Sequence, residues 1–140
     1  MPVAKKFTLG KNERLKSRKS IEELFTSGKS FHIGPYRVHY QIKKEESNKT
    51  STLLQFGVGV SGKYFKKAVD RNRIKRLTKE AYRQQKLFLQ DQLKEKNLPL
   101  HVFFIYTEKE LPVFQHITEK VAIALKKLAK LINENSTPDS

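Results

Sequence analysis

The chain has 140 residues, which is the length of one domain and too short for two full cores. Its apolar fraction of 37% is enough for one compact core. Its 29 Lys and Arg against 14 Asp and Glu give a formal net charge of +15, which favours a polyanionic partner, nucleic acid first and an anionic membrane surface second. The lack of cysteine excludes disulfides and thiolate metal sites, and the lack of a membrane-spanning run or secretory signal makes us expect a cytoplasmic protein without a membrane partner.

A short helix is predicted close to residue 20. Ser20 and Glu23 have the spacing of a capping box, in which two side chains bond to backbone N–H groups at the start of a helix. Its apolar side would consist of Ile21, Leu24 and Phe25. Gly28 would end the helix.

Three strands are predicted from the period-two alternation of apolar residues. Segments 36–43 and 53–60 each present one apolar face, as half-buried strands do. Gly57 and Gly59 lie on the second face of segment 53–60, so another group must approach the backbone there. Segment 100–106 is apolar on both faces, which indicates a central, buried strand.

Two longer helices are predicted. The first spans residues 68–89 and is followed by a charged linker over 91–97. The second begins near Pro112, a residue suited to a first helical turn. The apolar stripe of this last helix consists of Ile117, Val121, Ala124, Leu125, Leu128 and Ile132.

This element order predicts a small α/β protein of the α+β type. Helix, two strands, helix, strand and helix should form a two-layer sandwich, in which helices pack on a small mixed sheet. We expect a basic N-terminal extension over residues 1–13, one α/β domain over 14–132 and a disordered polar tail over 133–140.

The strongest functional signal lies between residues 63 and 83, where nine basic side chains stand against Asp70 and Glu80. The nine are Lys63, Lys66, Lys67, Arg71, Arg73, Lys75, Arg76, Lys79 and Arg83. A helical projection separates an apolar stripe from a charged arc, with Arg73 at the margin. The stripe consists of Ile74, Leu77, Ala81 and Phe88. The arc consists of Arg71, Asn72, Lys75, Arg76, Lys79 and Arg83.

A solvated helix face is the alternative explanation of this pattern. Solvated faces, however, mix signs into stabilising (i, i+4) pairs. This face repeats one sign at Arg71, Lys75 and Lys79, which costs helix stability by self-repulsion. Phosphates would neutralise that charge, and the planar guanidinium of arginine suits both phosphates and stacked bases. We therefore predict a nucleic-acid interface on this helix.

The segment 71–83 resembles the arginine-asparagine-arginine signature of the bacterial ribonuclease P protein component. Residues 57–63 resemble that family's entry from strand to helix, and residues 14–16 before Phe25 resemble its N-terminal part. The resemblance covers about residues 14–130. It implies the family's sandwich with a left-handed βαβ crossover, although the general rule for parallel crossovers predicts the right hand.

By this resemblance, the signature helix docks on the catalytic RNA of ribonuclease P. The residues given this role are Lys63, Lys66, Lys67, Arg71, Asn72, Arg73, Lys75, Arg76 and Lys79. The resemblance also implies a cleft between the sheet and the first helix for the single-stranded 5′ leader of precursor tRNA, since aromatic stacking in a positive groove commonly holds single strands. Its candidate members are Phe25 and either Tyr36 or Tyr40, and each of them could instead belong to the core.

No catalytic residue or metal ligand is predicted in this chain. Its four histidines, His32, His39, His101 and His116, lack ligand spacing, and no carboxylates have the arrangement of a two-metal nuclease site. The resemblance implies that the RNA subunit holds magnesium and hydrolyses the phosphodiester, while the protein holds no cofactor. It further implies one protein bound per catalytic RNA, with precursor tRNA as the second partner.

Two other classes of function remain open on the sequence. A ribosomal or other structural RNA-binding protein would share the charge and need not have an aromatic cleft. A DNA-binding regulator is disfavoured, because it needs a recognition helix with a short turn to a preceding helix, or a dimer interface, whereas here the basic helix follows a strand. We therefore expect a ribonuclease P subunit that assists endonucleolytic removal of the 5′ leader and does not bind DNA.

Overall fold

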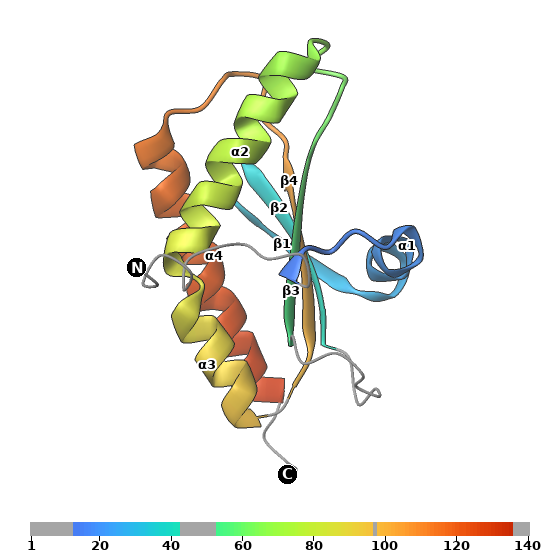
Figure 1. The fold of residues 1–140 in the computed structure, drawn as a ribbon, viewed down its shortest axis with the longest axis vertical. Helices are drawn as coiled ribbons and strands as arrows, with labels where there is room; N and C mark the ends of the chain where they lie inside the picture. Colours follow the sequence, from blue (N-terminus) through green and yellow to red (C-terminus); the bar gives the residue numbers. More distant parts are fainter. Residues whose placement is uncertain (1–12, 43–52, 97, 136–140) are drawn as a thin grey trace, which may run out of the picture.

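The computed structural model describes residues 13–42, 53–96 and 98–135. In chain order the elements are α1 Arg18–Ser27, β1 Lys29–Ile33, β2 Tyr36–Ile42, β3 Leu54–Val60, α2 Ala68–Gln85, α3 Leu87–Lys96, β4 Leu100–Tyr106 and α4 Phe114–Asn135. The strands form one sheet in the order β1-β2-β4-β3, in which β3 and β4 are parallel and the other neighbours are antiparallel. Helices α2, α3 and α4 cover one face, and α1 lies against the other (Figure 1). The predicted α+β fold with a mixed sheet is confirmed.

The core lies between the sheet and the helices α2, α3 and α4. Alternate residues of β2, β3 and β4 point into it, and β4 occupies the central position that its apolar sequence predicts. The buried strand residues are Tyr36, Val38, Tyr40, Leu54, Phe56, Val58, Leu100, Val102, Phe104 and Tyr106. All six residues of the apolar stripe predicted for α4 are buried as well. The segment from β3 through α2 and α3 to β4 is the parallel crossover to which the family resemblance assigns a left hand.

Helices α2 and α3 replace the single helix predicted over residues 68–89. The helix breaks at Lys86, whose side chain is buried and forms an ion pair with Glu13 of the N-terminal segment. The chain then continues as α3 to Lys96, so the prediction of a charged linker over 91–97 is wrong. The charged residues of this stretch lie on the solvent side of a helix whose other side buries Leu89 and Leu93.

The buried side of α2 and α3 differs from the predicted stripe. Ile74 and Ala81 are buried as predicted, but Phe88 is 44% exposed. Thr78 and Tyr82 are also buried on α2, and after the break at Lys86 the buried residue on α3 is Leu89 instead of Phe88. A projection of one straight helix does not include this break.

Helix α1 begins earlier than the capping box predicts. The hydroxyl of Ser17 accepts a hydrogen bond from the backbone N–H of Ser20 at 3.2 Å, so Ser17 is the N-cap and Ser20 lies inside the helix. The predicted end is confirmed. The N–H of Gly28 donates to the carbonyl oxygen of Leu24 at 2.9 Å, and a Cβ at Gly28 would lie 2.6 Å from that oxygen.

Strand β1 is absent from the prediction. It pairs with β2 through a turn at Gly34 and Pro35, in which Gly34 has a φ of 55°. A positive φ followed by the fixed negative φ of proline is the sign pattern of a type II′ hairpin turn, whose twist matches that of the strands. The strand is five residues long and largely polar, so periodicity alone does not reveal it.

Helix α4 is displaced from its predicted bounds at both ends. It begins at Phe114 instead of Pro112 and continues to Asn135, so the boundary of the predicted tail at residue 133 is wrong. The rest of that tail, residues 136–140, and residues 1–12 of the predicted basic extension lie outside the described residues.

Candidate nucleic-acid interface

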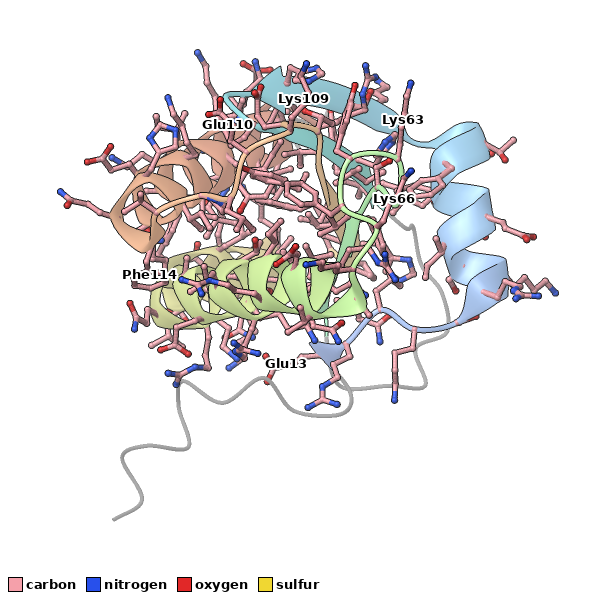
Figure 2. The ribbon with its side chains drawn as sticks, turned by 90° about the horizontal axis from the view of Figure 1, so that it is seen from above. Glu13, Lys63, Lys66, Lys109, Glu110 and Phe114 are labelled. Atoms are coloured by element: carbon pink, nitrogen blue, oxygen red, sulfur yellow. The ribbon has the colours of Figure 1, made fainter. Side chains whose placement is uncertain are left out.

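The predicted basic residues form one surface along α2 and the loop that precedes it. The exposed members are Lys63, Lys66, Lys67, Asn72, Arg73, Arg76 and Lys79, and the half-buried members are Arg71 and Lys75. Figure 2 shows Lys63 and Lys66 in the loop at the N-terminal end of α2. Within the part of the chain that the structure describes, Arg73, Lys75, Arg76 and Lys79 have no carboxylate at salt-bridge distance. We call the seven exposed and two half-buried members together the α2 surface.

Arg71 differs from the other members because its guanidinium is engaged within the protein. Its Nη1 donates hydrogen bonds to the carbonyl oxygens of Phe65 at 2.7 Å and Lys66 at 2.9 Å. Phe65 is buried against Tyr106, with 6.1 Å between the ring centroids. Arg71 therefore holds the loop that carries the lysines against the start of α2, so this nitrogen positions the surface.

Arg14 extends the α2 surface, and the sequence prediction does not include it. The N–H of Leu15 donates to the carbonyl oxygen of Phe56 at 2.9 Å, which places Arg14 beside the outer edge of β3. Burial lowers the pKa of Lys79, and the positive charges of Arg14 and Lys75 lower it further. Lys79 therefore lies within electrostatic range of both Arg14 and Lys75.

An ion pair lies towards the C-terminal end of this charged face. Arg83 donates to both carboxylate oxygens of Glu80, at 3.1 and 2.6 Å, and these hydrogen bonds hold the pKa of Glu80 below its usual value. The (i, i+3) pair is the arrangement expected of a solvated helix face. Arg83 therefore differs from the four cations between residues 73 and 79, for which the described residues supply no carboxylate at salt-bridge distance.

A second candidate surface lies on the sheet face beside α1. Phe25 is 44% exposed. Its ring lies 4.6 Å from that of His39 and packs edge-on against Phe103 at 5.4 Å. The absent side chain of Gly57 makes room for Phe103, because a Cβ there would lie 2.7 Å from that ring. The close approach that the glycines predict is thus confirmed, and the approaching group is aromatic.

The predicted partners of Phe25 lie on the other side of the sheet. Tyr36 is fully buried and its hydroxyl bonds to that of Thr78 on α2 at 2.6 Å; Tyr40 is 8% exposed. Strand residues alternate between faces, so His39 shares the face of Phe25 while both tyrosines enter the core. The prediction that Tyr36 or Tyr40 lines a cleft with Phe25 is therefore wrong.

The residues that take this place are His39 and Phe103, with Arg37 exposed next to them on β2. Burial lowers the pKa of His39, and the positive charge of Arg37 lowers it further. The imidazole is thus held in its neutral form near neutral pH, in which it stacks as an uncharged ring. Phe25, His39 and Phe103 are called the α1 platform below.

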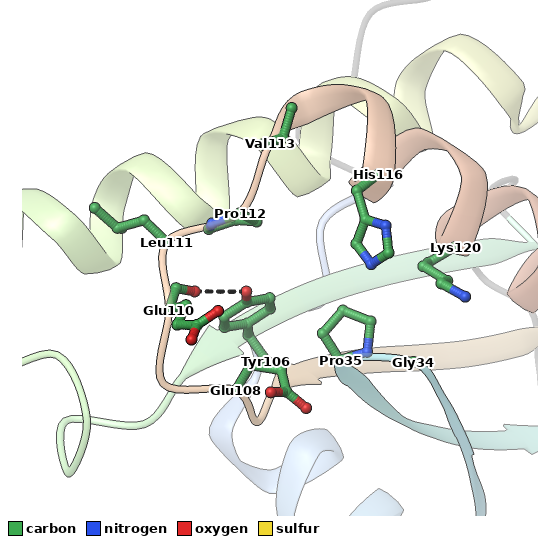
Figure 3. Close-up of a pocket in the computed structure, with 10 residues that line it drawn as sticks. All are labelled: Gly34, Pro35, Tyr106, Glu108, Glu110, Leu111, Pro112, Val113, His116 and Lys120. Atoms are coloured by element: carbon green, nitrogen blue, oxygen red, sulfur yellow. Dashed lines mark hydrogen bonds between the residues drawn. The ribbon is translucent and has the colours of Figure 1, made fainter.

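A separate hollow of about 530 Å³ lies where β4 leads into α4 (Figure 3). The hydroxyl of Tyr106 donates to the carbonyl oxygen of Glu110 at 2.8 Å, and burial, assisted by Glu108 and Glu110, raises the pKa of Tyr106 to about 12. The lining carries both signs of charge, since Lys120 of α4 lies on the same hollow as these two carboxylates. The hollow belongs to neither surface defined above.

The described residues contain no group of three or more His, Asp or Glu side chains that could hold a metal ion. Nor does any described helix combine the length and apolar character needed to cross a bilayer. What the structure brings together is a one-signed basic face and an open aromatic platform. A basic face and an exposed aromatic platform are features typical of proteins that bind nucleic acid.

Comparison with known proteins narrows this class. A family model described as ribonuclease P matches residues 9–129. The ribonuclease P protein component of Porphyromonas gingivalis (strain W83) is 38% identical over 123 residues, 88% of each chain. That of Chlorobium phaeobacteroides is 31% identical over 122 residues, covering 82% of this chain and 84% of the relative. The chain therefore belongs to the ribonuclease P protein family, as its signature segment implies.

Solved structures of two RNase P proteins share the fold. The Thermotoga maritima protein superposes with a TM-score of 0.61 at 24% identity, covering 82% of this chain and 96% of that one. The Staphylococcus aureus protein gives 0.59 at 22% identity, covering 83% and 94%. The likeness at this identity concerns the arrangement of helices and strands.

Proposed function

We propose that this chain binds the catalytic RNA of ribonuclease P through the α2 surface and the 5′ leader of precursor tRNA through the α1 platform. Membership of the family supports its role as a protein subunit of ribonuclease P, an endoribonuclease complex that processes tRNA. The observation that carries the proposal is the run of cations on α2 without carboxylate partners among the described residues. Such a face gains most when phosphates replace water and counterions around it.

The α1 platform suits an unpaired strand. Every base has a flat face, so exposed rings bind single strands with little dependence on sequence. Phe25 leaves nearly half of its surface open while His39 and Phe103 fix its orientation. Mature tRNA lacks the leader, so this platform would favour precursor over product.

In this proposal the RNA subunit, with magnesium, hydrolyses the phosphodiester bond. The chain's own residues supply positive charge, aromatic contact and a rigid sheet that fixes the distance between the two surfaces. One protein molecule would bind each catalytic RNA in the cytoplasm. It would assist the endonucleolytic cleavage by which the RNA subunit removes the leader.

The variant Arg73→Ala, Lys75→Ala, Arg76→Ala tests the docking. Each lost phosphate contact should make the plot of log affinity against log salt shallower by close to one unit, so the triple variant should lose about two to three units. The probe is the ribonuclease P RNA of the source bacterium, and circular dichroism confirms folding. An unchanged salt slope would exclude α2 from the interface.

A second measurement tests the division of labour between protein and RNA. The isolated protein should leave precursor tRNA intact at every magnesium concentration, whereas the protein with its RNA should cleave it. Cleavage by RNA-free protein that disappears on substitution of a carboxylate would identify a protein nuclease and contradict the proposal.

A further inference from the structure

A second basic surface lies on α4, away from α2. Its members are Lys120, Lys126, Lys127 and Lys130, which we call the α4 lysine surface. Lys126, Lys127 and Lys130 are exposed and Lys120 is half-buried. Among the residues that the structure describes, no carboxylate lies at salt-bridge distance from any of the four.

Two of these lysines are held in place by strand β1 and its turn. The Nζ of Lys127 lies over the ring of Phe31, 5.1 Å from its centroid. The side-chain carbons of Lys120 pack against Gly34, where a Cβ would lie 2.8 Å from the Cδ (Figure 3). These cations therefore have defined positions along the edge of the sheet.

The lysines also repeat along α4 at spacings at which their positive charges repel one another. Lys126 and Lys130 are separated by four residues, and Lys127 and Lys130 by three, so neighbouring turns of α4 present the same sign. Like charges at these spacings destabilise a helix. A polyanion would reverse that cost, as it would on α2.

The α4 lysine surface and the α2 surface face different directions. Helix α2 packs on β3, while Lys120 and Lys127 contact the β1–β2 hairpin, and β1 and β3 are the two edges of the sheet. Four strands separate these edges by about 14 Å, before the helices and side chains add to the distance. Seen end-on, α2 and the β1–β2 hairpin lie on opposite sides of the molecule (Figure 2).

We propose that the α4 lysine surface binds the phosphate backbone of a second, double-helical RNA segment, so that one protein molecule joins two RNA helices. Paired RNA fits better than a single strand, because sites for single strands typically add open aromatic faces to the positive charge. Here Phe31 is partly buried and Lys127 covers its ring. The surface is independent of the α2 surface and of the α1 platform, so it extends the proposed function.

Native mass spectrometry of the full chain with a blunt-ended RNA duplex of one helical turn tests the proposal. The wild-type protein should form a complex of one protein with two duplexes. The variant Lys120→Gln, Lys127→Gln, Lys130→Gln should bind the second duplex about tenfold more weakly and stop at one. The matched control, Lys19→Gln, Lys94→Gln, Lys96→Gln, removes the same charge from α1 and α3 and should keep both duplexes.

The α2 triple variant separates this proposal from the proposed function. If both hold, that variant retains one duplex, and adding the three α4 substitutions removes it. If only the α4 surface binds RNA, the wild-type protein forms a one-to-one complex that the α2 variant keeps and the α4 variant loses.

Equal behaviour of the α4 variant and its control would overturn the proposal. So would binding to anionic vesicles that the α4 variant loses while it keeps both duplexes, since that would assign the surface to a membrane.

Discussion

Phe25 and Phe88 have the same exposed fraction, 44%, and quite different surroundings. Phe25 stands on the rings of His39 and Phe103 at the sheet face beside α1, whereas Phe88 lies on α3 next to Asp91 and Gln92. Exposure alone therefore does not identify a ring that binds a base. Neighbouring side chains that fix the orientation of the ring are the better indicator, because a ring with one preferred position loses less entropy when a base stacks on it.

Replacing Phe25 with Ala should weaken binding of the leader. Stacking of one base on a ring contributes about 1–3 kcal/mol, so the Michaelis constant of the holoenzyme for precursor tRNA with a long leader should rise about five- to a hundredfold. Affinity for mature tRNA should stay the same. Phe88→Ala is the matched control and should change neither value. Equal losses for precursor and mature tRNA would leave the platform without a role in leader binding.

Replacing Gly57 with Ala should disturb the same platform from below. The new methyl group would lie 2.7 Å from the ring of Phe103 and 3.2 Å from the carbonyl oxygen of Leu15. Overpacking of this kind costs about 1–3 kcal/mol, which urea denaturation would measure. Gly62→Ala, where a Cβ meets nothing within 4 Å, should leave stability nearly unchanged. Similar stabilities for the two variants would show that Phe103 moves aside freely.

At the scale of the element, two serines have different roles at the N-terminus of α1. Ser17 caps the helix, while Ser20 donates its backbone N–H to the Ser17 hydroxyl. Ser17→Ala should therefore lower the free energy of unfolding of α1 by about 0.5–2 kcal/mol. Ser20→Ala removes no cap and should change it by less. Hydrogen exchange of the first-turn amides measures both, and a larger effect at Ser20 would restore the capping box that the spacing to Glu23 predicts.

Periodicity predicted the elements whose own residues determine their burial. Strands β2, β3 and β4 and the stripe of α4 follow from alternation and helical spacing. Strand β1 and helix α3 were missed, since a short polar strand depends on its partner and a charged helix on the core beneath it. The observed bounds of α1 and α4 differ from the predicted bounds, because the cap and the first turn of a helix depend on local hydrogen bonds.

The candidate site shows the same division. Charge and spacing identified the basic face of α2, since a helix places its own residues on one side. The period of β2 showed that Tyr36 and Tyr40 share a face, but no local pattern states which face meets α1, and the choice was wrong. Arg14 joins the α2 surface only because residues 13–15 run along β3, a contact between segments far apart in the chain.

At the scale of the whole molecule, the charge of +15 predicts an unusual response to salt. Between about 0.1 and 1 M salt the Debye length falls from about 10 to 3 Å, which weakens repulsion among the lysines and arginines. The melting temperature of the RNA-free protein should therefore rise by a few degrees, roughly, while its affinity for RNA falls. Sodium chloride is the appropriate salt, because sulfate also strengthens apolar burial. A melting temperature that falls with sodium chloride would show that attractive ion pairs outweigh the repulsion.

The central position of β4 also determines when the sheet can form during synthesis. Both of its neighbours, β2 and β3, precede it in the chain, and β4 pairs with each along its whole length. Until Tyr106 has left the ribosome, the β1–β2 hairpin and β3 have no common partner strand. The side of the hairpin that α4 covers stays exposed for longer still, because α4 follows β4 in the chain. Pairings between distant segments slow folding and leave a nascent chain prone to association. A polyanion that already engages α2, which is synthesised before β4, would keep such chains apart while the last strand is added.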